Sequence, residues 1–116
     1  MFRTLIAVLL LLSSTLTVAS ERAHQAWQQI RQNEAVIIDV RSPGEYAEGR
    51  LKGAINIPYD VIGEEIAQLG LAKDQPIVVY CRSGRRSGIA QEVLQNQGFK
   101  KVHNGGGLQE MLESGR

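Results

Sequence analysis

Three short apolar runs, separated by stretches with helical spacing, most constrain how this chain can fold. The runs cover residues 35–40, 54–57 and 77–80, and isoleucine and valine predominate in them. Runs of this length and composition suit strands that are buried on both faces. Strands that alternate with helices form a parallel sheet with helices packed on both sides. The sequence therefore predicts one α/β domain built on a small parallel β-sheet.

Helix signals fill the gaps between these runs. Ser42 suits an N-cap, Pro43 suits the first helical position, and Glu45 completes a capping box. Asp60 is predicted to cap the next helix, which stops near Gly70. An apolar face at helical spacing also predicts an N-terminal helix over the core, and its members are Ala23, Ala26, Trp27 and Ile30.

The C-terminal third continues the alternation. An apolar stripe predicts a helix from about Arg86 to Gln97, and residues 101–103 are predicted to form a last short strand. A terminal helix follows, with Leu108, Met111 and Leu112 expected to face the core. Ligands of parallel sheets bind beyond the C-terminal ends of the strands. The site is therefore expected at the end of the 77–80 run.

The first twenty residues have a different character from the rest. Arg3 precedes an apolar run over residues 5–12, and small residues follow. This pattern is typical of a signal peptide, with cleavage after residue 19 or 20. The run is too short to span a bilayer, which needs roughly 20 apolar residues. We expect an exported domain over residues 21–116 with no stable membrane span after cleavage.

Charge and composition exclude several function classes. Removing residues 1–20 takes away one arginine and no acid, so the 13 basic residues become 12 and balance the 12 acidic ones. A neutral domain is a poor candidate for binding nucleic acid, which depends on clustered cations. His24 and His103 lack partners at metal-ligand spacing, so no metal site is predicted. The single cysteine cannot form an internal disulfide. We also expect the protein to be a monomer.

That cysteine, Cys81, opens the segment Cys81-Arg82-Ser83-Gly84-Arg85-Arg86 between the third run and a helix. Helix N-termini and nearby cations lower the pKa of a thiol and favour the nucleophilic thiolate. Backbone N–H groups of such a loop can surround an anion, and glycine permits the tight turn. The segment therefore predicts a cysteine nucleophile that acts on a small anionic ligand.

The spacing within this loop bears on the chemistry. A phosphate loop of the tyrosine-phosphatase type has arginine six positions after cysteine, where this chain has Ser87. Arg86 comes one residue earlier, and a tighter loop suits a sulfur atom better than a phosphoryl group. A phosphatase or an arsenate reductase is therefore the disfavoured alternative.

The loop through Ser87 resembles the active-site loop of rhodaneses, the thiosulfate sulfurtransferases. Residues 39–46 are similar to the family's first signature, residues 53–58 to its second, and residues 105–108 to its glycine turn before the last helix. The chain departs from the usual pattern at Arg50 and Lys52, where many members have histidine and proline. The signal peptide makes it most similar to the periplasmic phage-shock group, which implies a periplasmic location.

The resemblance implies a rhodanese-like fold and a two-step reaction. The Cys81 thiolate takes the outer sulfur of thiosulfate, releases sulfite, and passes the persulfide sulfur to cyanide or a thiol. No metal or organic cofactor is required, since the intermediate is the covalent cysteine persulfide. The implied substrate-binding residues are Arg82, Ser83, Gly84, Arg85 and Arg86. Arg82 is the first candidate for the sulfonate end of the donor and Arg85 the second, while Arg86 serves structure as much as substrate.

Two interpretations remain beside this one. Asp39 and Arg41 belong to the first signature, and we interpret them as a buried ion pair near the site with a structural role, because buried charges are normally paired. The rival function is a persulfide carrier or redox-interaction module, in which Cys81 hands sulfur to a partner protein.

Overall fold

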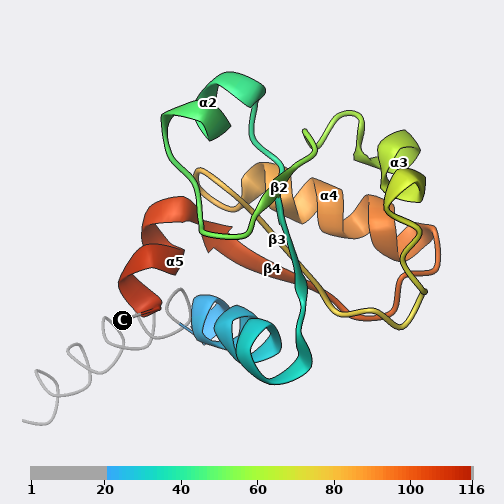
Figure 1. The fold of residues 1–116 in the computed structure, drawn as a ribbon, viewed down its shortest axis with the longest axis horizontal. Helices are drawn as coiled ribbons and strands as arrows, with labels where there is room; N and C mark the ends of the chain where they lie inside the picture. The colour runs from blue at the N-terminus through green and yellow to red at the C-terminus, as the bar shows by residue number, and fades with distance from the viewer. Residues whose placement is uncertain (1–20, 116) are drawn as a thin grey trace, which may run out of the picture.

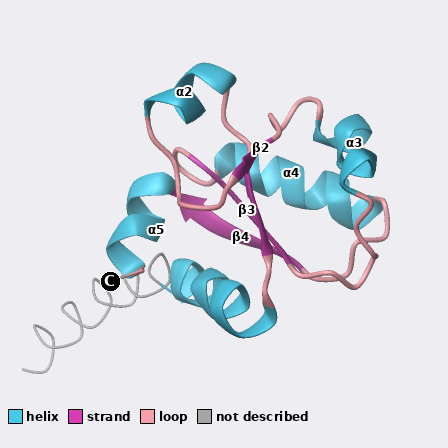
Figure 2. Cartoon of the chain, in the orientation of Figure 1, coloured by secondary structure: helices cyan, strands magenta, loops and turns pink. Residues whose placement is uncertain are grey.

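The computed structural model describes residues 21–115 of the 116-residue chain. Its centre is a four-stranded sheet in the order β2-β1-β3-β4, with every neighbouring pair parallel. Figure 2 shows these strands between the helices. The strands are β1 (Val36–Asp39), β2 (Ile55–Asn56), β3 (Ile77–Cys81) and β4 (Val102–Gly107). The predicted α/β fold with a small parallel sheet is confirmed.

Helices cover both faces of the sheet. They are an N-terminal helix over residues 21–33, α2 (Pro43–Glu48), α3 (Ile62–Glu65) with the 3-10 helix η1 (Ile66–Leu69), α4 (Arg85–Asn96) and α5 (Leu108–Ser114). Figure 1 shows α3 and α4 on one side of the sheet, and the N-terminal helix with α5 on the other. Within residues 21–115, no helix has the length and apolar character needed to cross a membrane. The expected signal peptide lies outside the described residues.

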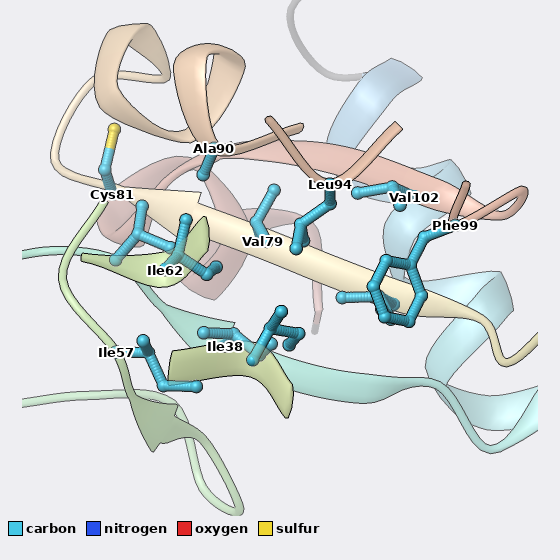
Figure 3. Packing of buried hydrophobic residues seen from close by; sticks show 12 residues of the cluster. Ile38, Ile57, Ile62, Val79, Cys81, Ala90, Leu94, Phe99 and Val102 are labelled. Atoms are coloured by element: carbon cyan, nitrogen blue, oxygen red, sulfur yellow. The ribbon is translucent and has the colours of Figure 1, made fainter. Parts of the chain in front are cut away.

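Side chains of β3 alternate between two cores, one on each face. Ile77, Val79 and Cys81 pack with residues of α3 and α4, whereas Val78 and Tyr80 pack with residues of the N-terminal helix and α5. Figure 3 shows the first core, with the Cys81 sulfur at its edge on the side of α4. The strand period therefore delivers the thiol to the start of α4.

The local helix signals were partly right. The capping box of Ser42 and Glu45 is present, and Gly49 is the C-cap of α2. The predicted Asp60 cap is wrong, because α3 begins one residue later with Val61 as an N-cap that makes no side-chain cap bond. The N–H of Val61 instead bonds to the carbonyl of Pro58 in a preceding turn. That turn shifts the start of the helix past Asp60.

The three consecutive glycines form part of β4 and not a turn, so that prediction is wrong and the strand extends well past residue 103. Asn104 pairs with Val79 while Gly106 pairs with Tyr80, which leaves Gly105 as the extra residue of a bulge. Gly106 has a φ of 94°, a left-handed value that glycine adopts without strain. The terminal helix also differs from expectation.

Met111 is the one residue of α5 that is buried. Met111 is fully buried, as predicted, but Leu112 is 42% exposed, so its predicted core position is wrong. The physical reason is the helical period, because neighbouring residues of a helix point about 100° apart and a seven-residue helix buries a narrow stripe.

Candidate active site

Cys81 is the last residue of β3, and its side chain is fully buried. The backbone N–H of Gly84 donates a hydrogen bond to Cys81 Sγ over 3.0 Å, and Ser87 Oγ lies 3.4 Å from the same sulfur. Gly84 is the N-cap of α4 and has a φ of 99°, which favours glycine at this position. The sulfur therefore lies inside a tight loop at the positive end of a helix.

This environment favours the thiolate. Burial raises the pKa of the Cys81 thiol, but hydrogen bonds from the Ser87 side chain and from the backbone N–H groups of Ser87, Ser83 and Gly84 outweigh that effect. The pKa of Cys81 is lowered overall. A lower pKa raises the fraction of thiolate near neutral pH, and the thiolate is the nucleophilic form.

Ser87 and Asn104 join the loop to β4, and sequence reasoning assigned a role to neither. The single proton of the Ser87 hydroxyl can be donated either to Asn104 Oδ1, over 2.7 Å, or to Cys81 Sγ, over 3.4 Å. Asn104 Nδ2 donates to the Gly84 carbonyl over 3.0 Å. The N–H of Gly106 donates to the same Asn104 Oδ1 over 2.9 Å. Ser87 was visible only as the residue at the phosphatase arginine position. Asn104 was missed because the last strand was predicted to end before it.

The loop residues predicted to bind substrate, Arg82 to Arg86, lie together around Cys81, but their arginines have different surroundings. Arg82 and Arg85 are exposed, and neither forms an ion pair within residues 21–115. Arg86 instead donates to both carboxylate oxygens of Glu45, over 2.8 and 3.0 Å. These hydrogen bonds lower the pKa of Glu45 to about 2. Arg86 therefore ties α4 to α2, while Arg82 and Arg85 remain available to an anion.

Asp39 and Arg41 form a buried ion pair, and Arg41 lines the same cavity as Arg82. Arg41 Nη2 donates to Asp39 Oδ2 over 2.7 Å, and the Tyr80 hydroxyl donates to the same oxygen over 2.7 Å. The Tyr80 hydroxyl in turn accepts the backbone N–H of Leu51, and Asn56 Nδ2 donates to the carbonyls of Asp39 and Arg41. Burial raises the pKa of Tyr80, so its hydroxyl stays protonated. The network holds the ends of β1, β2 and β3 together.

Two cavities flank the Glu45–Arg86 pair. One of about 320 Å³ includes Val40, Tyr59 and Arg86 in its lining, and one of about 410 Å³ includes Glu48 and Arg82. The larger cavity is the better candidate for substrate entry because Arg82 directly follows the nucleophile. In the described part of the chain, no three residues among His, Cys, Asp and Glu gather as a metal site.

Comparison with known proteins identifies the family. A family model described as "Rhodanese-like domain" matches residues 22–113. Thiosulfate sulfurtransferase PspE of Escherichia coli K12 is 43% identical over 74 residues, which cover 64% of this chain and 71% of PspE. Thiosulfate sulfurtransferase GlpE of Ectopseudomonas mendocina is 32% identical over 80 residues, which cover 69% of this chain and 72% of GlpE.

A solved structure, described as a rhodanese with anions from E. coli, is 42% identical to this chain and has a TM-score of 0.63. The match covers 66% of this chain and 89% of the chain in that structure. The family model spans most of the chain, and it includes both the parallel sheet and the Cys81 loop. This chain therefore belongs to the rhodanese-like family.

Proposed function

We propose that this sulfurtransferase moves a sulfane sulfur from thiosulfate, through a persulfide on Cys81, to cyanide or a thiol acceptor. The observation that carries the proposal is the placement of Cys81 Sγ against the Gly84 N–H at the start of α4, with Arg82 and Arg85 exposed beside it. The two relatives named as thiosulfate sulfurtransferases support the choice of donor.

In the first half-reaction, the Cys81 thiolate attacks the outer sulfur of thiosulfate. A new sulfur–sulfur bond forms to Cys81, and the bond inside thiosulfate breaks with its electron pair leaving on sulfite. The outer sulfur of the persulfide then carries the negative charge, which loop N–H groups aimed at the site stabilise. In the second half-reaction, the acceptor attacks that outer sulfur and the electron pair returns to the Cys81 thiolate.

The same loop disfavours phosphate chemistry. The position of the phosphatase arginine is occupied by Ser87, whose hydroxyl lies 3.4 Å from Cys81 Sγ. The nearest alternative, Arg86, is engaged with Glu45. A tetrahedral phosphoryl group would therefore lack the guanidinium that such loops place over it.

The decisive experiment is the intact mass of the protein after incubation with thiosulfate. The wild type should gain one sulfur atom, and Cys81→Ser should gain none while keeping its circular dichroism spectrum. Cyanide should then remove the sulfur and produce thiocyanate. Equal labelling of the serine variant would rule out Cys81 as the sulfur carrier. Slow release to cyanide together with fast release to one partner protein would instead support the carrier alternative.

A second prediction concerns the donor site. Arg82→Ala should raise the KM for thiosulfate several-fold more than it changes release of sulfur to cyanide, since only the donor carries a sulfonate group. Arg85→Ala should have a smaller effect in the same direction. Lys100→Ala, an exposed cation beyond α4, is the matched control. A KM for thiosulfate that is unchanged in Arg82→Ala would contradict this role.

We also propose that the domain over residues 21–116 is exported to the periplasm after cleavage behind residue 19 or 20. Support comes from Arg3 and the apolar run that follows it. N-terminal sequencing of the protein from separated cell fractions tests this proposal. A full-length protein that begins at Met1 in the cytoplasmic fraction would contradict it.

A further inference from the structure

Arg22 of the N-terminal helix reaches the back of the active-site loop. Its Nε and Nη2 donate to the two carboxylate oxygens of Glu110, each over 2.8 Å. The same Nη2 lies 3.3 Å from the carbonyl oxygen of Ser83 and donates to it. A side chain 61 positions away in the sequence from Ser83 is thus part of the loop's support.

Two glycines make room for this guanidinium. A Cβ atom at Gly84 would lie 2.8 Å from Arg22 Nη1, and one at Gly106 would lie 2.7 Å from Arg22 Nε. Such distances are shorter than atoms tolerate without displacement, so any side chain at either position would push Arg22 away. Arg22 therefore packs directly on the backbone of the loop and of the β4 bulge.

One peptide unit connects Arg22 to the nucleophile. The carbonyl of the Ser83–Gly84 peptide accepts from Arg22, and the N–H of the same peptide donates to Cys81 Sγ over 3.0 Å. A donor on the carbonyl polarises the peptide and strengthens its N–H as a donor. It also opposes rotation of the peptide, which would turn the carbonyl oxygen toward the sulfur and repel a thiolate.

We propose that Arg22 is a positioning residue for the sulfur chemistry of Cys81. By holding the Ser83 carbonyl, it keeps the Gly84 N–H on the sulfur and stabilises the anionic forms of the site. The part that concerns the persulfide rests on the proposed function. The part that concerns the thiolate does not rest on it, because Cys81 can lose its proton in the absence of any sulfur-donating substrate.

The charged residues around Cys81 determine in which direction each substitution should shift the pKa of its thiol. They come from the N-terminal helix, α2, the loop, α4 and α5, and they are Arg22, Glu45, Arg82, Arg85, Arg86 and Glu110. Removing the charge of Arg22 takes away a cation and the support of the peptide, so the thiolate is destabilised. Removing the charge of Glu110 takes away an anion and leaves Arg22 unneutralised, so the thiolate is stabilised. The two variants should move the thiolate in opposite directions.

The test is a titration of the thiolate ultraviolet absorbance in the purified protein, with Cys81→Ser as the blank. Because Cys81 is the only cysteine, the signal belongs to one group. Arg22→Gln should move the midpoint to higher pH, Glu110→Gln should move it to lower pH, and Arg22→Lys should restore most of the wild-type value. At a pH well below the wild-type midpoint, Arg22→Gln should form persulfide about threefold more slowly for each half unit by which the midpoint rises.

Arg31→Gln is the matched control. Arg31 lies on the same helix, and its Nη2 donates to the Gly115 carbonyl over 2.8 Å, away from the loop. This variant should lose stability without moving the thiolate midpoint. An unchanged midpoint in a folded Arg22→Gln variant would overturn the proposal. Should Arg22→Gln fail to fold, a higher midpoint in Glu110→Gln would overturn it just as well. Failure of the proposed function would appear separately, as a wild type that gains no sulfur.

Discussion

Tyr80 and Cys81 are neighbours on β3, yet they face opposite sides of the sheet and have different duties. Cys81 faces α4 and receives the Gly84 N–H, while Tyr80 faces the other core and bonds to Asp39. At the scale of single residues, the nucleophile Cys81 and the structural residue Tyr80 are therefore adjacent in the sequence but lie on opposite faces of β3. Variants of the two positions should affect different measurements.

Tyr80→Phe removes a hydroxyl that donates to Asp39 Oδ2 and accepts the Leu51 N–H. Both partners are buried, so the loss should lower the free energy of unfolding by about 1–3 kcal/mol. Urea denaturation measures this change. Persulfide formation in the folded variant should stay close to the wild-type rate. A large loss of persulfide formation with unchanged stability would show that Tyr80 takes part in the chemistry.

Gly107 marks a close approach between β4 and the active-site loop. A Cβ atom at this position would overlap the carbonyl oxygen of Arg82. Gly107→Ala should therefore displace the loop, lower the melting temperature and slow persulfide formation. Gly44→Ala is the control, because nothing lies within 4 Å of the added carbon and alanine favours the helix. Equal activity of the two variants would contradict the close approach.

At the scale of elements, one ion pair joins α2 to α4 across the mouth of the site. Glu45 and Arg86 are 41 positions apart in the sequence, and both also belong to local helix starts. The pair keeps α2 against the helix that supplies the dipole at Cys81. It also makes part of the stability depend on pH in a known direction.

The folded-state pKa of Glu45, about 2, lies below its ordinary value of 4.5. A carboxyl group with a depressed pKa contributes stability above the ordinary value and loses it as the pH falls toward the folded value. Between about pH 5 and pH 2.5, wild type should therefore lose more stability than Glu45→Gln. At neutral pH, the variant should be less stable by up to about 1 kcal/mol. Parallel pH dependence of the two proteins in urea denaturation would argue against this pair.

Elements were predictable where their signals are local. The capping box of Ser42 and Glu45 spans four residues, and the sequence of β3, including its cysteine, is one apolar run. The contacts of Arg22 with Glu110, 88 positions away, carry no such pattern. The role of Asn104 could not be predicted for a related reason. Glycine weakens a strand, so the three glycines predicted an early end to β4, but the strand continues through them by way of a bulge. The missed parts of the site are those that tertiary packing alone brings together.

At the scale of the whole molecule, two cores share one sheet. β1 and β3 send alternate side chains to each face, so neither core exists without the other. Such a layered domain should unfold in a single cooperative step. A substitution that destabilises the core on one face of the sheet should therefore lower the stability of the whole domain.

Leu94 lies in the core beside α4 and Met111 in the core beside α5, and both are fully buried. Leu94→Ala and Met111→Ala should each lower the free energy of unfolding by about 2–5 kcal/mol. The exposed Leu112 is the control, and its alanine variant should change little. Calorimetry should give one transition in every case. Two separate transitions in either core variant would contradict a shared core.

The burial of Cys81 has a consequence for how copies of the protein meet. A disulfide between two copies would need their sulfur atoms about 2 Å apart, but Sγ is covered in each folded copy. Cross-linking through this thiol therefore requires the loops of both copies to open, whereas a small anion has to reach only one sulfur atom. In an oxidising compartment such as the one proposed, the folded chain should resist covalent dimerisation, although its thiol has no cysteine within the chain to pair with.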